Sequence, residues 1–238
     1  MLAVSRTSRG LVRQNNEDSI LVRTPNLFAI ADGMGGYNAG EIASFEAVRL
    51  LSDLDCSQLP EEEVLKFIEE KIKKINSQVW TMSQEIPEQR GMGTTLTAVY
   101  LGKKGVAFVG HVGDSRIYLM QDGILKQITS DHSLVAEMVR QKQITPSEAE
   151  VSSQKHVIMR AIGALPEVQV DLFEFIIIGA QKMLLCTDGL SDMVSKEVME
   201  KLLLGKDLDT IADKLLELAL AAGGKDNISF IILDLEDC

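Results

Sequence analysis

The stretch TTLTAVYLGKKGVAFVGHV (residues 94–112) contains two β-rich apolar runs separated by Gly102-Lys103-Lys104-Gly105. Two such runs around a short glycine-containing loop are typical of a β-hairpin. A second pair follows directly, because Ile117–Met120 and Ile124–Ile128 flank the favoured turn dipeptide Asp122-Gly123. Adjacent hairpins predict an antiparallel sheet and not a repeating βαβ unit.

Amphipathic helices are expected in blocks around these hairpins. The clearest is Pro60–Trp80, whose apolar stripe is Val64, Ile68, Ile72, Ile75 and Val79. Gly40–Leu54 is predicted to be a helix with Ile42, Phe45, Val48 and Leu51 spaced along one side. A capping box at Thr145-Pro146-Ser147-Glu148 predicts the start of a short helix. The remaining helices are expected at Lys196–Leu204 and Leu208–Ala222, and the remaining strands at Ser19–Val22, Leu27–Ala31, Val170–Ile178, Met183–Thr187 and Ile228–Leu233. This segregation favours an α+β fold, with sheets packed face to face and helices outside.

The composition is that of one globular unit without linkers or repeats: 238 residues, 45% hydrophobic and 25% charged. The net charge of −11 argues against nucleic acid and anionic membrane as partners. The cysteines, Cys56, Cys186 and Cys238, are far apart and odd in number, which disfavours a disulfide framework. The N-terminus lacks the signal-peptide pattern, and no apolar run reaches membrane-spanning length. We expect a soluble, cytoplasmic monomer with a single domain over residues 1–238.

Aspartates occur where apolar strands are expected to end. Asp32 follows the run at 27–31, Asp114 follows the run at 106–112, and Asp188 follows the run at 183–187. Asp226 comes just before the last predicted strand. Carboxylates fixed by rigid elements suit hard cations such as Mg²⁺ and Mn²⁺, which prefer oxygen ligands.

Simpler explanations compete with this hypothesis. Asp-Gly is a common tight-turn dipeptide, so Asp32-Gly33 and Asp188-Gly189 could each be turns only. Arg13 in RQNNED (residues 13–18) is suited to hold a tetrahedral phosphate, but the segment could equally be a solvated charged loop. Composition and spacing alone therefore support a possible hard-metal site and no more.

Several segments together resemble the metal-dependent protein serine/threonine phosphatase family, called type 2C or PPM, in its compact bacterial form. They occur in the family's order and span nearly the whole chain: RQNNED (13–18), ADGMGG (31–36), VGDSR (112–116), TDGLSD (187–192) and KDNIS (225–229). Each segment is a weak signal alone, but the ordered set is specific. The resemblance implies an α-β-β-α sandwich in four layers, with a flap over about residues 129–163.

The same resemblance implies roles residue by residue. Asp32 would bridge two Mn²⁺ or Mg²⁺ ions, and the Gly33 carbonyl would bind one of them. Asp188 and Asp226 would bind the other ion, with Asp18 acting directly or through a water. Arg13 would clamp the phosphate. Asp114, with Asp192 as a possible neighbour, would help to hold a weaker third ion.

The sequence departs from the family pattern at three positions. Ser8 stands where the family usually has Asp, Tyr37 where many bacterial members have His, and Met34 where animal members have a His proposed as general acid. We expect Ser8 to weaken support of the site without abolishing metal binding, and the general acid is unassigned. Among the histidines, His111 is expected in or near the core, His132 in a loop and His156 on the surface.

The implied function is hydrolysis of phosphoserine and phosphothreonine in proteins, by attack of a water that bridges the metals. The partners would be phosphorylated proteins, including a bacterial Ser/Thr kinase and its substrates. The alternative is a phosphatase-like scaffold that binds phosphoproteins with little or no catalysis. A regulatory phosphatase with one dedicated phosphoserine substrate is a third possibility, although such proteins usually carry sensory domains.

Overall fold

The structure is a computed structural model that describes residues 2–35 and 39–235. Its strands are β1 (Ala3–Ser8), β2 (Asp18–Arg23), β3 (Leu27–Met34), β4 (Gly93–Thr94), β5 (Leu96–Leu101), β6 (Val106–Val112), β7 (Arg116–Gln121), β8 (Ile124–Gln127), β9 (Asp171–Ile176), β10 (Ala180–Cys186) and β11 (Ile228–Asp234). Its helices are α1 (Gly40–Leu51), α2 (Glu61–Glu85), α3 (Leu134–Arg140), α4 (Pro146–Glu150), α5 (Asp188–Ser191), α6 (Lys196–Leu203) and α7 (Leu208–Ala221).

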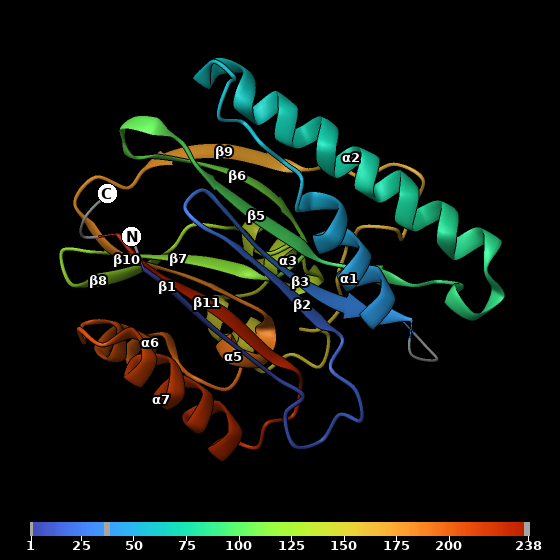
Figure 1. Ribbon diagram of the computed structural model, residues 1–238. Coiled ribbons are helices and arrows are strands. Elements are labelled where there is room, and N and C mark those ends of the chain that lie inside the picture. The colour runs from blue at the N-terminus through green and yellow to red at the C-terminus, as the bar shows by residue number, and fades with distance from the viewer. Residues whose placement is uncertain (1, 36–38, 236–238) are drawn as a thin grey trace.

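Two antiparallel sheets form the centre of the molecule (Figure 1). One has the strand order β1-β11-β10-β7-β8 and the other β2-β3-β5-β6-β9, with β4 paired to the end of β3. Their facing sides share one apolar core, to which Phe28 and Val109 contribute from one sheet and Leu185 and Ile231 from the other. Each sheet is covered on its inner face by the other sheet and on its outer face by helices, which explains why the central strands are nearly continuous apolar runs.

Helices cover both outer faces of this pair of sheets (Figure 1). The helices α1 and α2 pack on the β3 sheet, through residues such as Ile68 and Ile72. The helices α6 and α7 pack on the β11 sheet, through residues such as Ile211 and Leu215. The predicted α+β fold with α-β-β-α layering is confirmed.

Both predicted hairpins are present. The strands β5 and β6 pair antiparallel around the loop at 102–105, and β7 pairs with β8. Asp122 and Gly123 both have positive φ, which the tight turn requires. The capping box at Thr145 also forms, with the Thr145 side chain accepting from the Glu148 amide.

Some local predictions were wrong or incomplete. Phe45 is 58% exposed and does not share the buried side of Val48 and Leu51, because α1 turns its small residues Ala43 and Ala47 to the sheet. That orientation allows a closer approach of helix to sheet than a phenylalanine would. The strand β1 was not predicted because AVSRTS carries little apolar signal; its pairing with β11 forms it.

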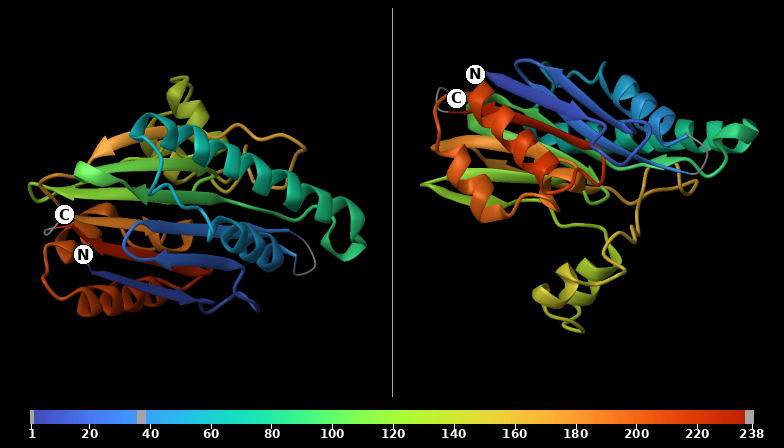
Figure 2. Two further views of the ribbon diagram at one scale, coloured as in Figure 1. Left: turned by 45° about the horizontal axis from the view of Figure 1, so that its top comes forward. Right: turned by 90° about the horizontal axis from the view of Figure 1, so that it is seen from below.

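The segment from residue 129 to 163, which contains α3 and α4, projects from the sandwich (Figure 2). Its return to the sandwich is held by a bridge between Thr94 and Ile162 and by the Gly163 amide, which donates to the Asn76 side chain at 2.8 Å. We call it the α3–α4 segment. None of the helices in the described ranges has the length and apolar content needed to cross a bilayer.

Candidate metal centre

Aspartates from both sheets meet at one end of the sandwich. Asp18 begins β2 and lies opposite Asp32 of β3 in the strand register. Asp188 begins α5 directly after β10, and Asp226 immediately precedes β11. A hydrogen bond connects the two sheets here, because the Thr187 hydroxyl donates to Asp18 Oδ2 at 3.0 Å. We call Asp18, Asp32, Asp188 and Asp226 the acidic site.

The carboxylates of the acidic site influence one another's ionisation. Burial raises the pKa of Asp32 well above its usual range, and the charges of Asp18, Asp188, Asp114 and Asp226 raise it further. Burial raises the pKa of Asp18 to about 7, with added repulsion from Asp188 and Asp226. The pKa of Asp188 is raised to about 6, mainly by burial and then by Asp226. Without a counterion, the folded protein therefore holds several carboxylates that repel each other.

The acidic site also contains buried oxygens without a partner. Among the described residues, Asp18 Oδ1 and Asp188 Oδ1 are buried and accept no hydrogen bond. Buried polar atoms are normally paired, so an unpaired carboxylate oxygen in an acidic cluster calls for a cation. An all-oxygen donor set fits Mg²⁺ or Mn²⁺.

Two glycines allow the close approaches that build this end of the molecule. A Cβ on Gly33 would collide with the carbonyl oxygens of Gly40 and Glu17. A Cβ on Gly189 would collide with the carbonyl oxygen of Asn227, so glycine lets α5 lie against the turn before β11. This contact brings Asp188 next to Asp226.

Asp114 and Asp192 lie beside the acidic site. Burial raises the pKa of Asp114 to about 7, and the charge of Asp188 adds to the shift. Asp192, at the end of α5, raises the pKa of Asp188 and accepts an ion pair from Lys155 at 2.6 Å. Both residues predicted for a third ion therefore lie where their charges interact with that of Asp188.

Arg13 is also at this end of the sandwich, although its guanidinium is not free. Its Nη2 atom pairs with Asp226 Oδ2 at 2.7 Å. Arg13 also lines a small cavity of about 100 Å³ with Gln14, Asn15, Glu17 and Asn227. The predicted phosphate clamp and one predicted metal ligand are thus in direct contact in this structure.

Sequence reasoning assigned no role to some other residues of the site. The Asn227 amide donates to the carbonyls of Arg9 and Asn15 and so holds the loop that carries Arg13. His156, expected on the surface, is exposed, but its Nδ1 lies 3.9 Å from Asp188 Oδ2. Thr187 and Asn227 lie inside the quoted segments TDGLSD and KDNIS, but their roles depend on contacts distant in the chain, and no local pattern marks His156.

The structure describes two of the three positions that depart from the family pattern, Ser8 and Met34. The Ser8 hydroxyl accepts from the Gly10 amide at 3.2 Å and so closes a turn before the Arg13 loop. Met34 is the half-buried last residue of β3. Tyr37 lies outside the described residues.

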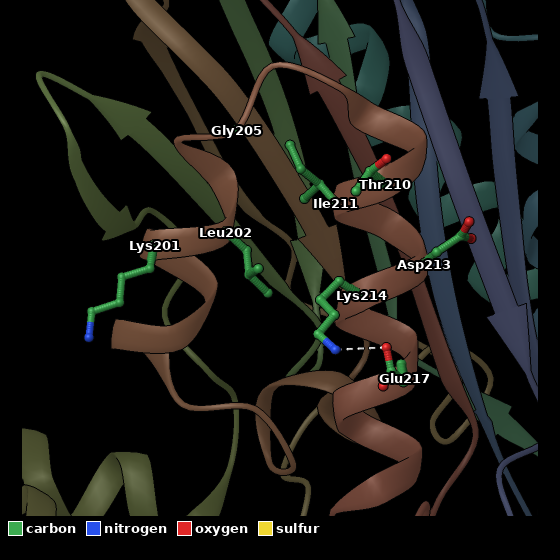
Figure 3. Close-up of a pocket in the computed structure, with 8 residues that line it drawn as sticks. All are labelled: Lys201, Leu202, Gly205, Thr210, Ile211, Asp213, Lys214 and Glu217. Carbon is green, nitrogen blue, oxygen red and sulfur yellow. Dashed lines mark hydrogen bonds and ion pairs between the residues drawn. The ribbon is translucent and has the colours of Figure 1, made fainter.

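A larger hollow, of about 510 Å³, lies between α6 and α7 on the outer face of the β11 sheet (Figure 3). Three of its four charged side chains are in ion pairs. Lys214 contacts Glu217 at 2.8 Å, as Figure 3 shows, and Asp213 contacts Arg6 at 2.8 Å. This hollow is larger than the cavity beside Arg13, but the buried carboxylate oxygens without a partner, Asp18 Oδ1 and Asp188 Oδ1, belong to the acidic site.

Comparison with known proteins identifies the family of this chain. The family model described as "Protein phosphatase 2C" matches residues 5–219, which include Arg13, Asp18, Asp32 and Asp188. This chain belongs to the protein phosphatase 2C family. A relative, the serine/threonine phosphatase stp of Listeria welshimeri, is 38% identical over 242 residues, covering 98% of this chain and 96% of that protein.

Solved structures of family members share the fold over nearly the full length. The serine/threonine phosphatase PstP/Ppp of Mycobacterium tuberculosis superposes with a TM-score of 0.92 at 40% identity, covering 99% of this chain and 98% of that chain. The catalytic domain of PstP in complex with two manganese ions gives a TM-score of 0.88 at 39% identity, covering 99% and 98%. Curated PstP itself is longer, and this chain spans 45% of it.

Proposed function

We propose that this protein hydrolyses phosphoserine and phosphothreonine in proteins with the help of two or three divalent cations, Mn²⁺ or Mg²⁺. The observation that carries the proposal is the acidic site, where coupled carboxylates from both sheets leave buried oxygens unpaired. Family membership supports the same reaction.

The residues that would hold the ions are those of the acidic site. Asp32 would be shared by two ions, the Gly33 carbonyl would contribute to one, and Asp188 and Asp226 would hold the other. Asp18 would bind directly or through a water, held in place by the Thr187 hydroxyl. Asp114 and Asp192 would help to hold a third ion. When bound, such cations activate water near neutral pH and offset the charge of the phosphoryl group.

The chain itself supplies the orientation of the substrate. Arg13 has an exposed side chain, 53% accessible, and lies beside the acidic site. A substrate phosphate would take the place of the Asp226 carboxylate on its guanidinium, since both are oxyanions that accept two parallel hydrogen bonds. This exchange would free Asp226 to bind a cation.

The direct test is hydrolysis of p-nitrophenyl phosphate and of a phosphothreonine peptide with Mn²⁺, repeated after addition of a chelator. We expect turnover with Mn²⁺ and its loss with chelator. Turnover that persists without metal would contradict the proposal. No observation on the described residues favours a non-catalytic scaffold, since every carboxylate of the predicted ligand set is present.

Further aspects of the proposal concern organisation and context. We propose that residues 1–238 form a single catalytic domain in which the α3–α4 segment acts as a flap, and that the chain works as a monomer in the cytoplasm. Cys56 and Cys186 are free and buried, which is consistent with a reducing compartment. The opposing enzyme would be a Ser/Thr kinase; phosphoproteomics of a strain lacking this gene would test both the kinase and its substrates.

A further inference from the structure

One compact group of metal-binding side chains among the described residues shares Asp188 with the acidic site and adds a histidine to it. The ligand atoms of His156, Asp188 and Asp192 lie within 4.8 Å of one another. We propose that His156 supplies a nitrogen ligand to a divalent cation held with Asp188 and Asp192. The inference rests on the proposed function in so far as Asp188 belongs to both sites.

The position of the two carboxylates is fixed by one helical turn. The Asp192 amide donates to the Asp188 carbonyl at 2.7 Å, so these residues are spaced i, i+4 along α5. Side chains four residues apart on a helix lie on the same face. Both carboxylates can therefore turn to the same ion without any backbone change.

The imidazole comes from a different part of the chain. His156 lies in the α3–α4 segment, and its side chain is 62% exposed and so free to rotate. Two ligand atoms at about 2.0–2.2 Å from one ion lie no more than about 4.4 Å apart. The present spread of up to 4.8 Å thus needs only a small rotation of His156 to close around an ion.

The ammonium group of a lysine already lies beside this group of side chains. Lys155 Nζ lies 2.6 Å from Asp192 Oδ2, so the ammonium group neutralises one of the carboxylates. The Asp188 oxygen nearest to His156 is Oδ2, which lies 3.9 Å from His156 Nδ1. A metal ion would replace the lysine on Asp192 and would also bind this Asp188 oxygen.

The donor set predicts which cations bind. Imidazole favours Zn²⁺, Co²⁺ and Mn²⁺ over Mg²⁺, which prefers oxygen ligands only. Binding would also join the α3–α4 segment to α5 of the sandwich. The site would therefore respond to the identity of the available metal, and Mg²⁺ alone would leave the segment untied.

The full chain loaded with Mn²⁺ allows a direct test by electron spin-echo envelope modulation, which detects nitrogen bound to the ion. The acidic site offers only oxygen ligands, and the other histidines of the described chain, His111 and His132, have both ring nitrogens in hydrogen bonds or ion pairs. A directly bound nitrogen would therefore report on His156. We expect the signal in the native protein and its loss in His156→Asn.

Two surface variants give opposite expected effects on the affinity for Zn²⁺, measured by calorimetry in the presence of saturating Mg²⁺. His156→Asn should weaken binding by at least about tenfold, since even the loss of a residue that only orients a ligand costs 10–100-fold. Lys155→Ala removes the competing ammonium and should strengthen binding. Equal affinities for native protein and His156→Asn, or Mn²⁺ binding without a nitrogen signal, would overturn the inference while leaving the proposed function intact. Failure of the proposed function would show instead as absence of Mn²⁺-dependent hydrolysis.

Discussion

Two groups of buried polar side chains lie at the same end of the β3 sheet, and they differ in how completely they are paired. In the acidic site, carboxylates face each other, and Asp18 and Asp188 each keep an unpaired oxygen. The second group, which we call the histidine network, is built around His111 and His132, whose ring centroids are 4.8 Å apart.

The histidine network is satisfied within the protein. His111 Nδ1 lies 2.8 Å from the Thr97 hydroxyl, and His111 Nε2 lies 3.2 Å from the Ser130 carbonyl. His132 Nδ1 accepts from the Gly113 amide at 3.0 Å, and its Nε2 lies 3.0 Å from Asp171. Burial lowers the pKa of His111 to about 4, so this ring is neutral at pH 7.

This difference in pairing predicts that the histidine network stabilises the fold and that the acidic site binds a ligand. A buried polar network with every member paired stabilises one conformation, whereas buried like charges without partners destabilise the fold until a ligand arrives. Changes in the acidic site should therefore abolish activity without loss of stability. Changes in the histidine network should do the reverse.

The largest expected effect is on catalysis, from Asp32→Asn. We expect activity to fall by at least about 10³-fold, equivalent to about 4 kcal/mol, because the residue shared by both ions loses its charge. The melting temperature of the metal-free protein should rise, because repulsion within the acidic site decreases. Asp213→Asn, the same change in the α6–α7 hollow, serves as control and should retain activity within about twofold. An active Asp32→Asn variant would remove the basis of the comparison.

A smaller loss is expected from Arg13→Ala. We expect KM for a phosphopeptide to rise by roughly tenfold, because a charge-assisted pair with the phosphate is lost. Arg13→Lys should recover only part of this loss, since an ammonium group cannot form two parallel hydrogen bonds. Steady-state kinetics measure both variants, and an unchanged KM in Arg13→Ala would assign the arginine to Asp226 alone.

The histidine network should show the opposite behaviour. His111→Ala should reduce the free energy of unfolding by about 2–4 kcal/mol, because it leaves a cavity and unpaired buried groups. Denaturant unfolding measures this loss, and Thr97→Val, which removes only one hydroxyl, should cost less. Manganese affinity of the folded variant should match that of the native protein; a large loss of affinity would show that the two regions are one functional unit.

The smallest effect concerns pH, and the two regions contribute with opposite sign. Burial raises the pKa of Asp18 and of Asp114 from 3.8 to about 7, so the folded, metal-free protein takes up protons at a pH where the unfolded chain does not. Its stability should rise by roughly 2–3 kcal/mol as the pH falls from 8 to 6.

His111 acts in the other direction at lower pH. Its pKa is lowered from 6.5 to about 4, so the unfolded chain is protonated first and stability falls as the pH drops through this range. Saturating Mn²⁺ should abolish the gain between pH 8 and 6, since bound cations keep the carboxylates ionised. Urea unfolding with chelator and with Mn²⁺ tests both; a metal-free protein that only loses stability below pH 8 would contradict the coupling at the acidic site.

Sequence patterns predicted the fold well wherever the signal is local. Turn residues such as Asp122-Gly123 and the cap at Thr145 depend on neighbours in the chain, and both formed as expected. The orientation of α1 was wrong at Phe45 because the choice between small and large residues for the helix–sheet contact depends on the sheet beneath it.

The candidate site could be anticipated only in part. The positions of Asp32 and Asp188 at strand ends suggested rigid carboxylates, but turn chemistry explained them equally well until the ordered segments were considered together. The contacts of Thr187 with Asp18 and of His156 with Asp188 join residues far apart in the chain. Such contacts follow from the packing of the two sheets and leave no periodic trace in the sequence.

The most direct measurement is a crystal structure of the protein grown with Mn²⁺, with the ions located by anomalous scattering. We expect two peaks about 4 Å apart, with an Asp32 oxygen near both and Asp188 and Asp226 on the same ion. No peak at this end of the sandwich, or peaks that Asp32 does not contact, would contradict the assignment of the acidic site as a metal centre.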